Sequence, residues 1–234
     1  DTTDTTDTTD TTDTTDTTDT TDTTDTTDTT DTQEALQTSN RNLENTEHGL
    51  LLFDNNASIV SQALQQYGEF TVGVRELFSQ LLSNGTEVVE FGSGIGVMSV
   101  EIAKHVGSNG RVWAENREPQ EFLLLCANLA LNEVKNVEFF DSISDIDLPD
   151  RCDMVVINDT PWTTELENIV TNKLSRDRPF IMTIGEIDGI EALRNFPNYL
   201  FVEYWVEVAR PDNFKGTQID EPLAPILCLV GAPS

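Results

Sequence analysis

Basic side chains are scarce in this sequence of 234 residues, which has 13 lysines and arginines against 42 aspartates and glutamates and a net charge of −29. A protein that binds nucleic acid needs clustered lysines and arginines to neutralise phosphates. The basic residues here are scattered along the chain. We therefore expect no nucleic acid partner.

Histidine, cysteine and long apolar runs are also scarce. The chain has two histidines and three cysteines, and Cys126, Cys152 and Cys228 lie far apart, so we expect buried free thiols in a reducing compartment and no metal site. No apolar run reaches the ~18 residues of a membrane span. The N-terminus has no signal-peptide pattern. These absences predict a cytoplasmic protein with no membrane contact.

The first 32 residues repeat Asp-Thr-Thr and contain no aliphatic or aromatic side chain. Such a segment buries too little apolar surface to offset its ordering entropy, so we predict a disordered tail over residues 1–33. The expected organisation continues with a linker and helical cap over residues 34–86. A core domain follows over residues 87–234.

The chain is organised around the stretch from Val88 to Ala103. Val88-Val89-Glu90-Phe91 is a short apolar run, typical of a parallel strand that is buried on both faces. Three glycines, at every second position from Gly92 to Gly96, let the backbone turn sharply and approach a ligand. The helix that follows offers its N-terminal amides to a polar group. The pattern predicts a nucleotide-like cofactor at this turn, and a tight turn without a ligand is the alternative.

The spacing distinguishes between cofactors. A dinucleotide fingerprint requires a third glycine at position 97, which is Val97, so a nicotinamide cofactor is disfavoured. The observed order, acid-x-Gly-x-Gly-x-Gly, resembles motif I of class I S-adenosylmethionine-dependent methyltransferases. That resemblance implies a cofactor site formed by Glu90, Gly92, Ser93, Gly94, Ile95 and Gly96. In it, Glu90 serves the methionine part of the cofactor.

Strands and amphipathic helices alternate along the rest of the core, which predicts an α/β fold with a doubly wound, mostly parallel sheet. Two late strands without an intervening helix predict an antiparallel hairpin at one edge of a seven-stranded, Rossmann-like methyltransferase sheet. The expected strands are 87–91, 111–115, 136–141, 152–158, 179–184, 199–208 and 224–230. The expected helices are 58–67, 71–82, 96–106, 119–131 and 162–174, and a further short strand is expected at 49–56.

A narrower resemblance covers residues 54–233. Tyr67-Gly68-Glu69-Phe70 leads into the glycine turn, and Val106 to Ala114 and Leu125 to Asn132 follow in the same order as in the FkbM-type methyltransferase family. The late segment from Pro225 to Pro233 resembles the closing hairpin of that family. The resemblance implies S-adenosyl-L-methionine as the cofactor. It also implies methyl transfer to an oxygen, on a small molecule or on a sugar or glycan hydroxyl.

The chain departs from that family at two strand ends. Asn116 aligns with the acid that the family places at the ribose hydroxyls, and Glu115 comes one residue earlier, so both stay candidates. At the fourth strand, the family signature Lys-Ile-Asp-x-Glu-Gly is replaced by Val156-Ile157-Asn158-Asp159 and the residues after it. These losses leave open a degenerate, non-catalytic binding or scaffold module as the alternative function.

The remaining candidates are weaker. Asn158 is expected at the cofactor, and Asp141 and Ser142 lie after the third strand, where the family contacts the adenine. Asp159 and His48 are the candidates for a general base, although a surface position is expected for His48. The sequence leaves the oligomeric state open.

Overall fold

The computed structural model describes residues 40–140, 151–174, 178–185, 187–216 and 223–234. None of the helices in these ranges is both long enough and apolar enough to cross a membrane. The strands are β1 (Arg41–Thr46), β2 (Gly49–Asp54), β3 (Glu87–Phe91), β4 (Arg111–Glu115), β5 (Val137–Phe140), β6 (Met154–Asn158), β7 (Phe180–Ile184), β8 (Tyr199–Val206) and β9 (Ile226–Pro233). The helices are α2 (Ile59–Tyr67), α3 (Val72–Leu81), α4 (Val97–Val106), α5 (Pro119–Leu131), α6 (Thr164–Ile169) and α7 (Ile190–Arg194).

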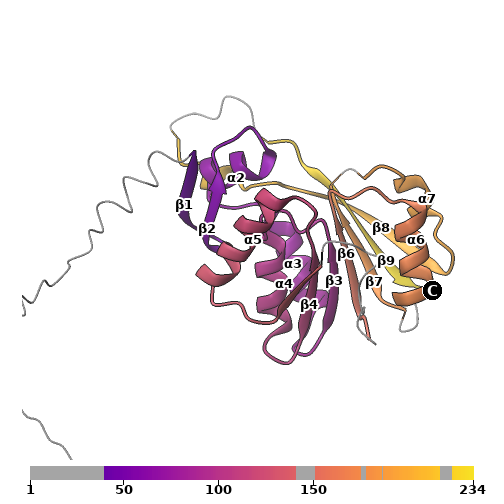
Figure 1. The fold of residues 1–234 in the computed structure, drawn as a ribbon. Coiled ribbons are helices and arrows are strands. Elements are labelled where there is room, and N and C mark those ends of the chain that lie inside the picture. Colours follow the sequence, from indigo (N-terminus) through magenta and orange to yellow (C-terminus); the bar gives the residue numbers. More distant parts are fainter. Residues whose placement is uncertain (1–39, 141–150, 175–177, 186, 217–222) are drawn as a thin grey trace, which may run out of the picture.

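Seven strands form one sheet in the order β5-β4-β3-β6-β7-β9-β8 (Figure 1). The pairs from β5 to β7 are parallel, whereas β9 runs antiparallel to both β7 and β8. From β3, the chain adds β4 and β5 on one side and then returns to add β6 and β7 on the other side, so the strand order reverses at β3. Ligands of open α/β sheets bind at such a reversal. The predicted fold, a doubly wound methyltransferase-type sheet with an antiparallel edge hairpin, is confirmed.

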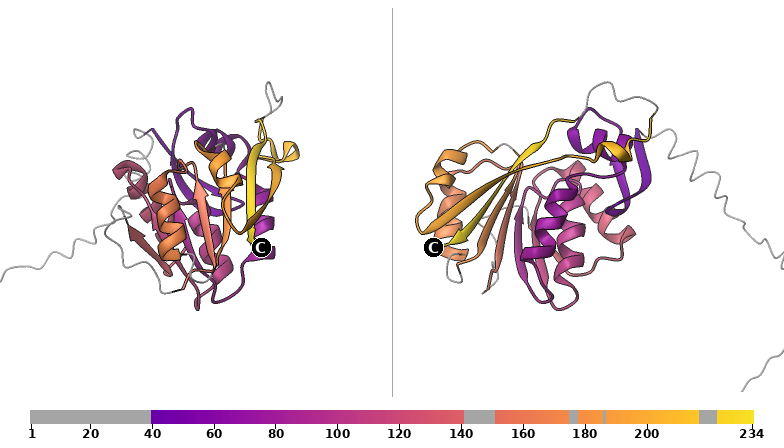
Figure 2. Two further views of the ribbon diagram at one scale, coloured as in Figure 1. Left: turned by 90° about the vertical axis from the view of Figure 1, so that its right-hand side faces the viewer. Right: turned by 180° about the vertical axis from the view of Figure 1, so that it is seen from behind.

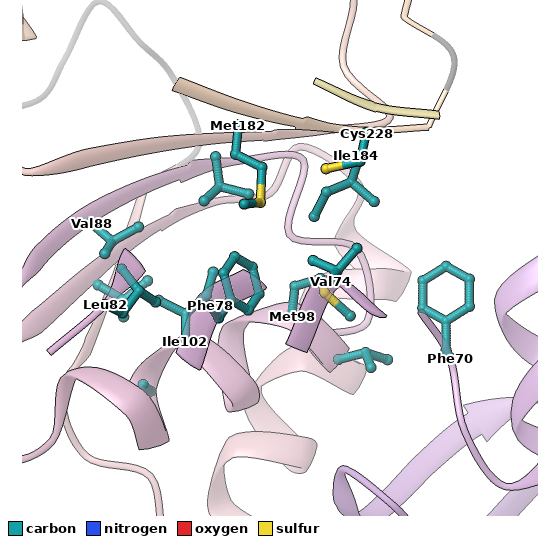
Figure 3. Close-up of a cluster of buried hydrophobic side chains, with 14 of the residues drawn as sticks. Phe70, Val74, Phe78, Leu82, Val88, Met98, Ile102, Met182, Ile184 and Cys228 are labelled. Atoms are coloured by element: carbon teal, nitrogen blue, oxygen red, sulfur yellow. The ribbon is translucent and has the colours of Figure 1, made fainter. Parts of the chain in front are cut away.

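Helices cover both faces of the sheet (Figure 2). On one face, α3 and α4 pack on the strands through a cluster that includes Phe78, Met98 and Ile102, and Figure 3 shows these side chains meeting Met182 and Ile184 of β7. On the other face, α6 and α7 pack on alternate residues of the same strands. Because β3 is covered from both sides, its side chains from Val88 onward are buried, and this fixes the position of the glycine turn that follows it.

The polar segment before β2 differs from the prediction. We expected a linker or a short helix there, but residues 41–46 form β1, which pairs antiparallel with β2 along its whole length. Helix α5 anchors this hairpin, because the buried side chain of Asn128 accepts from the Leu52 N–H at 2.6 Å and donates to the Leu52 carbonyl at 3.0 Å. The same amide group also donates to the Ile95 carbonyl at 2.8 Å. Asn128 therefore joins the hairpin to the glycine turn, and neither hydrophobic periodicity nor turn residues signal this pairing.

An ion pair between buried Glu69 and half-exposed Arg210 ties the cap helices to the connection between β8 and β9. The Glu69 carboxylate, which is fully buried, accepts from the Arg210 guanidinium at 2.7 and 3.0 Å and from the Asn213 amide at 2.8 Å. Burial acts to raise the pKa of Glu69, but the hydrogen bonds from Arg210 and Asn213 outweigh it and hold that pKa below its usual value. The ionised pair thus holds the α2–α3 connection in place at neutral pH.

Smaller differences concern element ends. The helix predicted over residues 162–174 begins at Thr164 and changes to a π-helical turn at Val170–Leu174, and the short helix α7 was not predicted. Cys152 and Cys228 are buried as expected, whereas Cys126 is partly exposed. Asp141, predicted as the last residue of the third strand, lies outside the described residues.

We predict that Asn128→Ala lowers the free energy of unfolding by about 2–4 kcal/mol, because the buried Asn128 side chain is lost and three partly buried backbone groups lose their hydrogen-bond partner. Chemical denaturation followed by circular dichroism measures this difference. Gln65→Ala on the exposed side of α2 is the matched control and should change the stability by less than about 0.5 kcal/mol. An Asn128→Ala variant as stable as this control would contradict the anchoring role.

Candidate S-adenosylmethionine site

A cavity of about 520 Å³ opens at the carboxyl ends of β3, β4 and β6, under the cap. The glycine turn forms its floor, the segment after β4 and the start of α5 form one wall, and the loop after β6 forms another. The cap contributes the segment just before α2 and the first turn of α2. The lining residues are Asp54, Asn56, Ser58, Ile59, Val60, Ser61, Gly92, Gly94, Ile95, Glu115, Asn116, Arg117, Glu118, Glu121, Leu124, Asn158, Asp159, Thr160 and Pro161.

The three glycines of the turn have different roles. A Cβ on Gly92 would lie 1.9 Å from the Asn158 carbonyl oxygen, and a Cβ on Gly96 would lie 2.5 Å from a methyl carbon of Leu125. Gly92 and Gly96 are therefore required for packing against β6 and α5. A Cβ on Gly94 would meet only a Glu121 oxygen at 3.9 Å, so the close approach of a ligand that the sequence predicts is possible at Gly94.

Glu115 and Asn116, the two candidates after β4, both contact the glycine turn. The Glu115 carboxylate accepts from the Gly92 N–H at 3.1 Å and pairs with Arg117. The Asn116 amide donates to the Gly94 carbonyl at 2.6 Å, and its oxygen accepts from the Glu118 N–H at 3.0 Å. Both side-chain ends of Asn116 are thus occupied, whereas the Glu115 carboxylate keeps lone pairs available for a further donor.

Ser93 supports the turn from beneath. Its N–H and its hydroxyl both donate to the Glu115 carbonyl, at 2.9 and 2.8 Å. Ser93 is 2% exposed and does not line the cavity. These bonds join the end of β4 to the turn after β3.

Glu90 lies beneath the turn, on the face of β3 that α4 covers, and is fully buried. One carboxylate oxygen accepts from the Ser99 hydroxyl at 2.6 Å, and the other has no hydrogen-bond partner among the described residues. Burial raises the pKa of Glu90 to about 7, an effect that the Ser99 hydrogen bond partly offsets. Glu90 does not line the cavity, so its predicted contact with the methionine part of the cofactor stays a prediction.

The two candidate bases lie in different surroundings. Asp159 lines the cavity and has a backbone φ of 46°, a strained conformation for a residue other than glycine. His48 is not on the surface, as we expected, but fully buried. Its Nδ1 lies 3.0 Å from a Glu101 oxygen and its Nε2 accepts from the Phe70 N–H at 2.9 Å. The expected surface position of His48 was wrong, and because both ring nitrogens are engaged and His48 does not line the cavity, the structure gives no support for a role as a base.

Of the other predicted residues, Ile95 and Asn158 line the cavity, while Gly96 begins α4 behind it. Asp141 and Ser142 lie outside the described residues. The sequence reasoning missed Arg117, Glu118 and Glu121. Glu121 could have been found from the sequence, because it lies in the first turn of α5. The first turn of a helix that follows a parallel strand lies at the same end of the sheet as the glycine turn.

The fold, the glycine turn and the cavity at the strand reversal together define a class I, S-adenosylmethionine-dependent methyltransferase. Comparison with known families agrees, since the family model described as the TRM5/TYW2 methyltransferase domain matches residues 57–181, more than half of the chain. The chain belongs to this family, and its cofactor is S-adenosyl-L-methionine.

Similar proteins carry several activities. A probable cobalt-precorrin-6B C(15)-methyltransferase (decarboxylating) from Sulfolobus acidocaldarius is 31% identical over 108 residues, which cover 45% of this chain and 56% of that protein. Precorrin-6y C5,15-methyltransferase from Geobacter metallireducens has a TM-score of 0.57 at 23% identity, over 69% of this chain and 88% of the other. M. jannaschii TYW2, solved in complex with AdoMet, has a TM-score of 0.54 at 19% identity, over 83% and 85%. These likenesses between structures establish the fold.

The resemblance to the FkbM-type family was wrong, since the family match is to a different group of methyltransferases. The residues that suggested it, the glycine turn and the regular alternation around it, follow from the fold that both groups share.

We predict that the stability of the protein without cofactor declines as Glu90 ionises. The pKa of Glu90 is higher in the folded state than in the unfolded state. The contribution of Glu90 to the free energy of unfolding is therefore fully present below the unfolded pKa near 4.5, and it is lost as the pH rises toward 7. Comparing denaturant titrations of the native protein and Glu90→Gln from pH 4.5 to 8 isolates this group, and the difference should change by about 3 kcal/mol.

Ser99→Ala is the matched variant for this test. Loss of its hydrogen bond to Glu90 should move the decline to higher pH, because that bond lowers the pKa of Glu90. A pH-independent difference between the native protein and Glu90→Gln would contradict the assignment.

Proposed function

We propose that this protein transfers the methyl group of S-adenosyl-L-methionine to a small acceptor that is uncharged or positively charged. The observation that carries the proposal is a group of three carboxylates at the cavity, from Glu118, Glu121 and Asp159. None of the three has an ion-pair partner within the described ranges, whereas Asp54 and Glu115, in the same lining, pair with Arg41 and Arg117.

The pKa of Glu121 supports mutual repulsion between these groups. Burial is the largest cause that raises this pKa, and the negative charges of Glu118 and Asp159 raise it further. A positive or hydrogen-bond-donating acceptor would relieve this repulsion, while an acceptor with many phosphates would increase it. The acidic cavity thus supports a small acceptor rather than a nucleic acid, in line with the charge of the whole chain.

The residues present at the cavity suit the cofactor. Gly94 leaves room for it, and Glu115 offers a charged acceptor for a pair of hydroxyl groups. When bound, S-adenosylmethionine supplies a methyl group that its sulfonium has already activated. The protein then has to orient the acceptor, exclude water and take up the proton that the acceptor loses.

We assign proton uptake to Asp159 or Glu121, which both line the cavity. A raised pKa brings a carboxylate closer to the range in which a general base is effective at neutral pH, and this favours Glu121. The methyl acceptor atom is not assigned to an oxygen, because that expectation depended on the FkbM-type resemblance.

The likeness to the precorrin methyltransferase favours a second candidate acceptor, a precorrin-like macrocycle. The matched segment spans 56% of the length of that relative, so its activity is carried over here only as an alternative. The assay below includes it as a separate acceptor.

For the cofactor, we predict that Glu115→Gln weakens binding by about tenfold, because a charged acceptor of two hydroxyl groups becomes a neutral one. Isothermal titration calorimetry with S-adenosylmethionine measures this. Glu165→Gln, on the exposed first turn of α6, is the control and should bind as the native protein does. Equal affinity in Glu115→Gln would remove Glu115 from the site.

For the acceptor, we predict turnover with small uncharged or amine-bearing compounds and none with RNA. Release of S-adenosylhomocysteine is measured with separate panels of these compounds, of precorrin-like macrocycles and of RNA hairpins. Replacing Glu118, Glu121 and Asp159 by their amides should lower kcat/KM for amine acceptors at least about tenfold, which is about 1.4 kcal/mol of transition-state stabilisation.

Methylation of the RNA hairpins would contradict the proposal, and turnover of the macrocycle alone would favour the second candidate. Cofactor binding without turnover on any panel would favour the non-catalytic alternative.

A further inference from the structure

Strand β8 leaves one edge of the main sheet open. It is the last strand in the sheet order, and among the described residues it pairs only with β9. Its eight residues, Tyr-Leu-Phe-Val-Glu-Tyr-Trp-Val, include no lysine, proline or glycine. Soluble proteins guard long edge strands with such residues or with bulges, because an open edge presents free N–H and C=O groups to another strand.

The open edge is also apolar. Leu200, Val202 and Tyr204 are 69%, 54% and 40% exposed, and because they alternate along the strand they share one face of the sheet. Val206, next in this row, is buried against Gly73 of α3, so α3 covers only the end of the row. On the other face, Trp205 is 66% exposed. Four of the ten large hydrophobic residues that are exposed in the described ranges therefore lie on this strand.

The other sheet edges differ. At the opposite end of the same sheet, β5 has four residues and one of them, Glu138, pairs with Arg111. In the hairpin, all residues of β1 except Leu43 are polar. The single charge of β8, on Glu203, is already paired with Arg194 of α7 at 2.7 Å. Each of these two strands exposes one large apolar residue, Phe139 of β5 and Leu43 of β1. Among the edge strands of the described residues, a row of exposed apolar side chains is thus specific to β8.

We propose that β8 pairs antiparallel with β8 of a second copy of this chain, which joins the two sheets about a two-fold axis. We choose a second copy as the partner of the open edge because the residues of β8 are complementary to those of an antiparallel β8. With Val202 opposite Val202, Leu200 of each copy lies opposite Tyr204 of the other, so the whole exposed apolar row is matched. The register centred on Glu203 would place two glutamates opposite each other, and this is unfavourable.

The net charge of the chain sets how this association depends on salt. Each copy carries a charge of −29, so two copies repel over long range, while their contact is apolar. Salt screens the repulsion within ~10 Å at 0.1 M and ~3 Å at 1 M. Dimerisation therefore strengthens as salt is raised, the opposite of an interface held by ion pairs. No residue of β8 lines the cofactor cavity, so pairing leaves that cavity open.

Sedimentation velocity of the full chain over a range of protein and salt concentrations tests the pairing. The native protein should form dimers that become tighter with salt, and Val202→Lys should be monomeric. Leu123→Lys replaces an apolar residue of α5 that is 61% exposed and should dimerise as the native protein does. Unchanged S-adenosylmethionine binding in Val202→Lys shows that this variant is folded. A native protein that stays monomeric throughout, or a dimer that persists in Val202→Lys, would overturn the proposal.

Cross-linking tests the register. Opposed residues of an antiparallel pair have Cα atoms ~4.5–5.5 Å apart, within the range that a disulfide spans. Oxidation of Val202→Cys should therefore give a covalent dimer, whereas oxidised Glu203→Cys and the oxidised native protein should not. Efficient cross-linking through Glu203→Cys in place of Val202→Cys would overturn this register.

Discussion

The close contact between the glycine turn and the end of β6 is the constraint on which the rest of the site depends. Gly92 approaches the Asn158 carbonyl so closely that no side chain fits at position 92. The turn is then held from β4 as well, by the Glu115 carboxylate on the Gly92 N–H and by Ser93 on the Glu115 carbonyl. Three strand ends thus form one rigid floor, and Gly94 is the position where that floor is open to a ligand. The cap closes over this floor because Asn128 and the pair of Glu69 with Arg210 fix it to the core.

Electrostatics divide this site into two regions. Below the turn, Glu90 is fully buried against α4, and its pKa is raised to about 7 by burial. Above the turn, the carboxylates of Glu118, Glu121 and Asp159 line the cavity without an ion-pair partner among the described residues, since Arg117 in the same lining is paired with Glu115. The lower region affects the stability of the fold, because the Glu90 carboxyl has to ionise inside the core when the pH rises. The upper region concerns recognition, because its charges meet whatever enters the cavity. An acidic cavity in an acidic chain is consistent with an acceptor that brings no negative charge.

The core fold was predictable from the sequence because each central element carries its own signal. The apolar run of β3 and the helical spacing of α5 gave boundaries that agree with the structure, and the late strand pair indicated the reversed β9. The hairpin partner β1 was not predictable, since its residues other than Leu43 are polar and its partner strand β2 is anchored by Asn128, far away in the sequence. The burial of His48 was missed for the same reason. Its hydrogen-bond partners, Glu101 and the Phe70 N–H, come close to its ring only in the folded chain. The assignment to the FkbM-type family was wrong because the glycine turn and the alternation of strands and helices are common to the whole fold class.

The central claim is that the cavity over the glycine turn is the cofactor site of a TRM5/TYW2-type methyltransferase domain. Hydrogen–deuterium exchange with and without S-adenosylhomocysteine tests it most directly, because it locates the bound ligand along the backbone without knowledge of the acceptor. The account predicts slower exchange of the amides in residues 92–97 and 115–121, and little change in β8 and β9. Protection confined to another part of the chain, or no protection at saturating ligand, would contradict it.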